Sequence, residues 1–314
     1  MKRSVIFFIC LLALSSFSIA DKIEDYNSYS QLQIMFNINS NIQATITDSS
    51  KLNYLKANLL LLPDNNYMQS SSLINISSNP DSEKIYGNSF VELNWNQISN
   101  NYQYDLNAIV ITNNKISKIP FIKYPISNIS PELKIYLEPQ KITDINEKII
   151  KKTNELIQDQ DNLFEASFQI AEWVHNNIKY DLNTLTESAS QKSSWVYDNK
   201  DGVCDEITSL FISMARSAGI PARFVTGMVY SNINYQFGNH GWAELYFPDY
   251  GWVPFDVTFG EYGWIDPSHV KLSDSLDAGQ PSIEYSWKSY QFDVENTSLN
   301  LNSNIIQTGA KINP

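Results

Sequence analysis

Residues 201–218, DGVCDEITSLFISMARSA, decide how the second half of the chain folds. Gly219, Ile220 and Pro221 follow this stretch and form a stop signal for a helix. The pattern therefore predicts an amphipathic helix with Cys204 in its first turn. The apolar residues recur at steps of three and four, as on one face of a helix: Val203, Ile207, Leu210, Phe211, Met214 and Ala218.

The predicted position of Cys204 has a chemical consequence. Free backbone N–H groups and the positive end of the helix dipole favour a thiolate over a thiol. Gly202 allows a tight turn just before the cysteine, although an ordinary loop glycine would look the same. Asp205 and Glu206 suit a helix N-terminus, yet their charges oppose a thiolate nearby, so we expect them to be structural.

The cysteine count bears on the same residue. The chain has two cysteines, and Cys10 lies in an apolar N-terminal segment that resembles a signal peptide. A mature chain would keep only Cys204 and could form no internal disulfide. A single free thiol in an exported protein is a candidate nucleophile. The alternative is an inert, buried cysteine.

A nucleophilic cysteine needs a base, and the chain has only three histidines. His240 begins a predicted strand at 240–247, which a turn at 248–251 connects to a second strand at 252–258. Asp256 is the one carboxylate in that second, apolar strand, so it needs a partner unless it faces solvent. The predicted hairpin places it beside His240. For His175 we expect a solvated helix face, and for His269 a structural or rim position.

Four linked motifs resemble the transglutaminase-like superfamily, in particular its secreted prokaryotic and archaeal members. They are DGVCDE at 201–206, MARSAGIPARFVTG at 214–227, HGWAELYF at 240–247 and GWVPFDVT at 251–258. The resemblance implies a papain-like triad of Cys204, His240 and Asp256. It also implies an α+β fold, in which a helix that bears the cysteine packs on an antiparallel sheet.

Two departures from the family pattern matter. Asp205 stands where the cross-linking enzymes have a tryptophan, and Gly241 stands where alanine is more usual. The first departure favours hydrolysis over cross-linking. Trp195 is a candidate oxyanion donor, with packing as the alternative, and Trp242 is a candidate cleft residue.

The rest of the chain suggests four regions. Residues 1–20 have a basic start, an apolar run and small residues before Asp21, as in a signal peptide; an uncleaved anchor is the alternative. Residues 21–138 alternate apolar and polar positions and predict a β-sandwich-like accessory domain. Residues 139–275 form the predicted catalytic domain. Residues 276–314 predict C-terminal strands and a flexible tail.

Composition limits the partners. The chain is 43% hydrophobic and 18% charged, and its formal net charge of −12 disfavours binding to nucleic acid or anionic lipid. Histidine and cysteine are too few for a zinc site, so we expect no cofactor. Calcium binding through scattered aspartates stays open, although no stretch has the spacing of a calcium loop. The oligomeric state stays open.

These observations predict a secreted or cell-envelope cysteine enzyme that acts on protein or peptide amides through a thioester on Cys204. The alternative is a non-catalytic surface or structural module that keeps the same fold.

Overall fold

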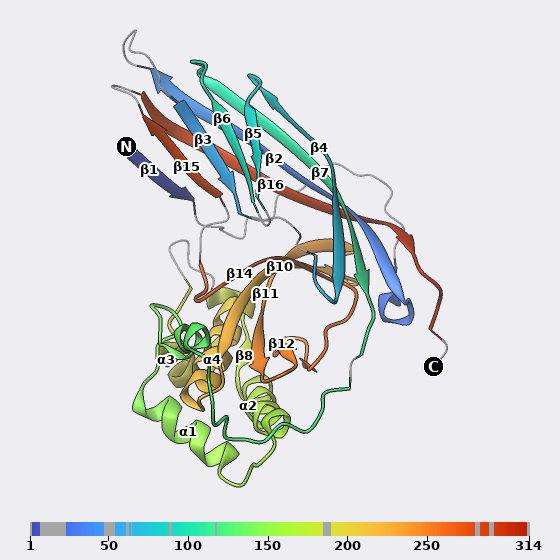
Figure 1. The fold of residues 1–314 in the computed structure, drawn as a ribbon, viewed down its shortest axis with the longest axis vertical. Coiled ribbons are helices and arrows are strands. Elements are labelled where there is room, and N and C mark those ends of the chain that lie inside the picture. The colour runs from blue at the N-terminus through green and yellow to red at the C-terminus, as the bar shows by residue number, and fades with distance from the viewer. Residues whose placement is uncertain are drawn as a thin grey trace.

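The structure is a computed structural model. It describes residues 2–6, 23–46, 54–60, 63, 65–87, 90–116, 118–184, 190–279, 283–288 and 292–312. The fold is α+β, with mostly antiparallel sheets (Figure 1).

Strands from the N-terminal part of the chain and two strands from its C-terminal part form two antiparallel sheets that share one apolar core (Figure 1). The sheets have the orders β1-β15-β3-β6-β5 and β16-β2-β7-β4. Tyr285 joins them, because its hydroxyl lies 3.2 Å from that of Ser40 and 3.3 Å from that of Tyr104. The strands are β1 (Lys2–Ile6), β2 (Gln31–Ile46), β3 (Tyr54–Leu59), β4 (Gln69–Asn79), β5 (Glu83–Tyr86), β6 (Val91–Trp95), β7 (Asn101–Asn113), β15 (Ile283–Lys288) and β16 (Phe292–Thr308).

The strands predicted for residues 276–314 are present as β15 and β16, and they complete this sandwich. Strand β15 pairs with β3, and β16 pairs along β2 from Phe292 opposite Ile46 to Thr308 opposite Leu32. The strand runs further than the sequence suggested: β16 continues to Thr308, and the Ile312 N–H donates to the carbonyl of Ser28. The accessory domain combines both ends of the chain, so it does not simply precede the catalytic region.

Four α-helices lie in the described residues of the second part of the chain, and the last of them is the one predicted from the 201–218 stretch (Figure 1). They are α1 (Glu147–Ile157), α2 (Leu163–Asn177), α3 (Ser193–Asn199) and α4 (Cys204–Ser217). Asn162 caps α2, since its side-chain oxygen accepts from the Phe164 N–H at 3.0 Å. Gly219, with a φ of 75°, follows the end of α4 as the sequence predicts. The helix from Cys204 is thus confirmed.

An antiparallel sheet of order β13-β12-β11-β10-β14 lies against α4. The predicted hairpin is formed by β11 and β12, with Ala243 opposite Phe255. One face of this sheet packs against apolar residues of α4 such as Leu210 and Phe211. The strands are β10 (Ala222–Ser231), β11 (Gln236–Phe247), β12 (Gly251–Asp256), β13 (Glu261–Tyr262) and β14 (His269–Ser275).

The start of β4 joins the two parts of the molecule. The Gln69 side chain, 2% exposed, donates to the carbonyl of Lys271 and accepts from its N–H, both at 2.8 Å. Met68 packs in one small cluster with Val225, Trp242 and Ile265. The sandwich therefore supports the opposite face of the sheet from α4.

The predicted signal segment is described only in part. Residues 2–6 form β1, which pairs with β15, while residues 7–20 lie outside the described residues. Within the described ranges, every helix is too short or too polar to span a lipid bilayer.

Candidate active site

The N-terminus of α4 places Cys204 at the start of the helix, partly exposed to solvent. Glu206, 1% exposed, fixes this end. Its carboxylate accepts from the Val203 N–H at 3.0 Å, the Gln191 N–H at 2.8 Å and the Thr184 hydroxyl at 2.8 Å. This structural role matches the expectation for Glu206, because the bonds tie the preceding loop to the first turn.

Asp205 lies directly against the sulfur. The distance from Cys204 Sγ to Asp205 Oδ1 is 3.6 Å. Burial raises the pKa of this carboxyl group, although its contact with Cys204 and the charge on His240 oppose the shift. Asp205 is therefore a polar neighbour of the Cys204 thiol, in addition to any role at the helix end.

Strand β11 meets α4 one helical turn after the cysteine. The Thr208 hydroxyl donates to the carbonyl of Gly241 at 3.0 Å. Thr208 and Cys204 lie four residues apart and share a face of α4, and Gly241 follows His240. This bond holds the cysteine end of the helix beside the histidine.

His240 and Asp256 form a buried pair across the hairpin. His240 Nε2 lies 2.5 Å from Asp256 Oδ2, and the two residues are 6% and 0% exposed. Burial alone would raise the pKa of Asp256, but the charges on His240 and His269 outweigh it and hold that pKa well below its usual range. Since Asp256 takes the Nε2 side, the Nδ1 side of His240 is left to act as a base.

His269 belongs to the same buried cluster. Its Nε2 lies 3.0 Å from Asp256 Oδ2, and its Nδ1 lies 2.9 Å from Asp266 Oδ1. Glu261 completes the cluster by accepting from the Asp266 N–H at 3.0 Å. Our expectation of a structural or rim position missed this contact with the triad. The spacing of Asp266 and His269, three residues apart in a turn, was the available signal.

Two aromatic rings enclose the histidines. Trp242, fully buried, stacks against His240 with ring centroids 6.1 Å apart and also lies edge-on to His269. Phe259, 44% exposed, meets both imidazoles edge-on at 5.1 and 5.7 Å. Trp242 thus lies under His240, while Phe259 separates the histidines from solvent. Phe259 gave no signal in the sequence.

Trp195 lies in α3, partly buried against the helical core. The indole N–H of Trp242 has no hydrogen-bond partner among the described residues. The oxyanion and cleft roles of both tryptophans stay predictions.

The histidines and carboxylates also form two groups whose ligand atoms lie within 4.8 Å of one another: His240, Asp256 and His269, and Glu261, Asp266 and His269. Ligands that share a tetrahedral zinc ion at about 2.0–2.1 Å would stand roughly 3.3 Å apart. The shortest separations here are 2.5, 2.9 and 3.0 Å, which are hydrogen-bond lengths. The geometry fits proton sharing better than ion binding.

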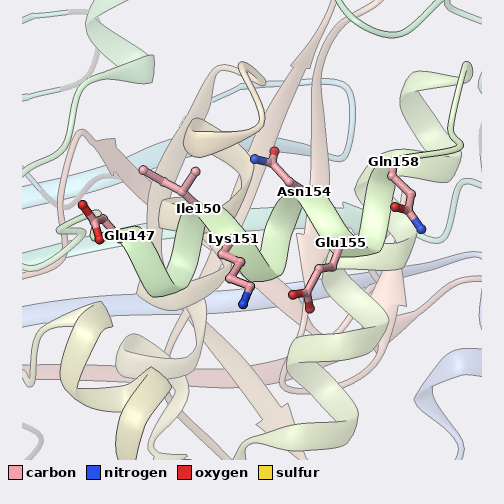
Figure 2. A pocket seen from close by; sticks show the side chains of 6 residues that line it. All are labelled: Glu147, Ile150, Lys151, Asn154, Glu155 and Gln158. Carbon is pink, nitrogen blue, oxygen red and sulfur yellow. The ribbon is translucent and has the colours of Figure 1, made fainter.

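Two shallow hollows lie elsewhere on the molecule. One, of about 530 Å³, runs along the exposed face of α1, where Lys151 and Glu155 point outward (Figure 2). The other, of about 370 Å³, lies over the polar face of β2 and β7. Neither hollow is lined by Cys204, His240 or Asp256. The candidate active site is therefore located from the chemistry of those three side chains and not from a hollow.

A family model matches the part of the chain that holds these residues. Residues 150–257, which include Cys204, His240 and Asp256, match the transglutaminase-like superfamily. This part of the chain is a transglutaminase-like domain. The match also covers α2, α4 and the β11–β12 hairpin, so the elements that carry Cys204, His240 and Asp256 belong to the transglutaminase-like core.

Two relatives are similar to this domain in sequence. YebA of Bacillus subtilis is 32% identical over 142 residues, which are 40% of this chain and 19% of that protein. The protein-glutamine gamma-glutamyltransferase of Pseudomonas aeruginosa is 29% identical over 93 residues, 27% of this chain and 14% of that protein. The chain therefore spans less than a fifth of either relative. Both organisms are bacteria, so these relatives give the archaeal resemblance no support.

A solved structure shares the fold over most of the chain. A proposed cysteine protease from Cytophaga hutchinsonii superposes with a TM-score of 0.54 at 18% identity, covering 90% of this chain and 96% of that one. At this identity the likeness shows the fold alone. It includes the sandwich as well as the transglutaminase-like domain.

Proposed function

We propose that the chain is an exported cysteine acyl-transfer enzyme that acts on peptide or carboxamide bonds. The observation that carries the proposal is the buried His240–Asp256 pair, held beside the helix that begins at Cys204. Asp256 fixes the imidazole through Nε2, which orients Nδ1 toward a neighbouring thiol. A cysteine at a helix start and an oriented imidazole are the two requirements of a thiolate nucleophile.

The reaction follows from these groups. The Cys204 thiolate attacks the carbonyl carbon, and the carbonyl oxygen takes the negative charge. Backbone N–H groups in the first turn of α4 point away from the helix and are suited to stabilise that oxyanion. The C–N bond breaks as His240 gives its proton to the departing amine, leaving a thioester. Water or a second amine then attacks the thioester carbon and gives a proton to His240, and the C–S bond breaks to release the acyl product and the Cys204 thiolate.

Asp205 favours water as the second reactant. It places a polar carboxyl group 3.6 Å from the sulfur, where a hydrogen-bonded water can be held near the thioester. Transfer to an amine is the second candidate, because the Pseudomonas aeruginosa relative carries the name of a glutamyltransferase. Export rests on the signal-like segment at 1–20, and the proposed substrate is a protein or peptide.

The experiment uses a glutamine-containing peptide and an excess of a primary amine, with the wild-type chain and Cys204→Ala. Hydrolysis gives ammonia or a shorter peptide without an amine adduct, whereas transfer gives the adduct. Intact-mass spectrometry after an acid quench should detect an acyl group on wild-type Cys204. Products that form equally with Cys204→Ala would refute the proposal.

A further inference from the structure

His269 lies between two buried carboxylates. Its Nε2 is 3.0 Å from Asp256 Oδ2 and its Nδ1 is 2.9 Å from Asp266 Oδ1, while the residue is 3% exposed. A neutral imidazole has only one N–H and can donate to only one of these oxygens. Both contacts become hydrogen bonds when the ring carries two protons, so the geometry favours an imidazolium.

The charges around the ring support this assignment. Burial would lower the pKa of His269, but the charges of Asp266 and Asp256 raise it well above its usual range. Burial raises the pKa of Glu261 to about 8, so this carboxyl is largely protonated at neutral pH. Tyr26 faces the same cluster, and burial raises its pKa to about 12, which keeps its hydroxyl neutral. The carboxylates of Asp256 and Asp266 then face one fixed cation, the imidazolium of His269. Asp256 also faces His240.

Asp266 anchors the imidazolium to a rigid turn. Its Oδ1 also accepts from the N–H of Ser268 at 2.8 Å and from the hydroxyl of Ser268 at 2.5 Å. His269 begins β14, which pairs with β10 inside the sheet. The side chain is therefore held from the backbone side and from Asp266 at once.

On its other side, His269 contacts Asp256, whose two carboxylate oxygens each have two hydrogen-bond partners. Asp256 Oδ1 accepts from the N–H groups of Thr258 at 2.8 Å and Phe259 at 3.0 Å. Its Oδ2 is shared by His240 at 2.5 Å and His269 at 3.0 Å. Four donors fix the plane of one carboxylate, and two of them hold the oxygen that orients the base.

We propose that His269 is a positioning residue of the triad: as an imidazolium clamped by Asp266, it holds Oδ2 of Asp256 on His240. This rests on the proposed function, since it assigns His269 a role in activating Cys204. His269 acts through Asp256 and touches neither the sulfur nor the substrate carbonyl in this proposal.

The first test is independent of catalysis. With only three histidines in the chain, ring ¹⁵N spectra can be assigned with His175→Gln and His269→Gln. We expect His269 to show two protonated nitrogens at pH 7.5, with N–H protons that exchange slowly with water. A spectrum of a neutral, singly protonated ring would overturn the proposal, even if Cys204 proved to be catalytic.

The second test measures alkylation of Cys204 by iodoacetamide at pH 7 in Cys10→Ser protein, so that only one thiol reacts. His269→Gln keeps a hydrogen-bonding amide but carries no charge, and we expect alkylation about tenfold slower or more, since a positioned base contributes about 10²–10⁴-fold. His269→Gln with Asp266→Asn also removes the opposing charge. We expect that pair of changes to restore thermal stability but not the alkylation rate.

The outcomes separate the possible failures. If His269→Gln lowers stability but leaves the alkylation rate of the folded protein unchanged, His269 is structural and the proposal is wrong. If wild-type Cys204 reacts like a free thiol while the ring spectra show the imidazolium, the proposed function fails and the positioning role fails with it. A spectrum of a neutral ring alongside a reactive Cys204 would refute the positioning role alone.

Discussion

The carboxylate of Asp205 occupies the space that a side chain at Gly241 would need. A Cβ built at Gly241 would lie 2.7 Å from Asp205 Oδ1 and 2.5 Å from the ring of Phe224. Asp205 and Gly241 are also the two positions at which this chain departs from the transglutaminase-like pattern. The structure therefore links the two departures: a carboxyl group beside the sulfur is accommodated by a residue with no side chain after the histidine.

Gly241→Ala tests this link. Because the added methyl overlaps both neighbours, we expect a loss of about 1–3 kcal/mol in the free energy of unfolding. Urea denaturation measures it. Asp205→Ala should recover part of the loss, with a coupling of about 0.5–3 kcal/mol in the double-mutant cycle. Strictly additive effects would show that the two residues do not compete for space.

Asp205→Asn tests how this carboxyl group affects the thiolate. A negative charge 3.6 Å from the sulfur opposes thiolate formation, so the amide should make alkylation of Cys204 severalfold faster at pH 7. The matched control is Asp198→Asn on α3. It removes one charge from an exposed ion pair that Asp198 forms with Lys148 of α1. An equal effect in both variants would indicate a general charge effect instead.

The raised pKa of Glu261 predicts that the free energy of unfolding depends on pH. Its pKa is raised from 4.5 to about 8 by burial, so the folded chain keeps a proton that the unfolded chain releases near pH 4.5. The contribution of Glu261 to the free energy of unfolding is therefore fully present below about pH 4.5 and is lost as the pH rises through 8. The raised pKa of His269 acts in the same direction above pH 6.5.

Glu261→Gln mimics the protonated carboxyl and removes its share of this dependence. We expect the wild type to lose more stability than the variant between pH 5 and 8. The difference should be on the order of a few kcal/mol, because a tenfold change in a proton-binding constant is worth about 1.4 kcal/mol. Urea denaturation across that pH range measures both chains. Parallel curves would contradict the assignment of a buried, protonated Glu261.

Gln69→Ala tests the junction between the sandwich and the transglutaminase-like domain. The change leaves the buried N–H and carbonyl of Lys271 without their partners, and each such group costs about 1–3 kcal/mol. Thermal unfolding should show a lower midpoint, while Ser72→Ala, at an exposed position on the same strand, should change little. A small effect of Gln69→Ala would mean that the junction does not depend on this side chain.

Much of the catalytic region could be predicted from sequence because its signals are local. Helical spacing from Val203 to Ala218 and the turn at 248–251 are enough to place Cys204, His240 and Asp256 on a helix and a hairpin. The resemblance to the transglutaminase-like superfamily then indicates that these three residues form a triad.

The rest depends on contacts between distant residues. Strand β16 pairs with β2 although its outward positions carry asparagine and serine, so its alternation is weak in the sequence. His269 looked like one histidine in a loop, because the carboxylates that hold it come from β12 and from its own turn. The closure of the sandwich by the C-terminal strands does not follow from a local pattern, and in the histidine cluster only the spacing of Asp266 and His269 is local.

The rate at which Cys204 is alkylated tests the central claim most directly. Cys10→Ser protein is treated with iodoacetamide between pH 5 and 9, with and without His240→Ala, and the urea-unfolded chain gives the rate of the same thiol without its surroundings. The account predicts that folded Cys204 reacts at least about tenfold faster than the unfolded thiol near pH 6.5, where a thiol of ordinary pKa near 8.5 is mostly protonated. It also predicts that His240→Ala abolishes this advantage. Equal rates in the folded and unfolded wild type, or no effect of His240→Ala, would contradict the triad.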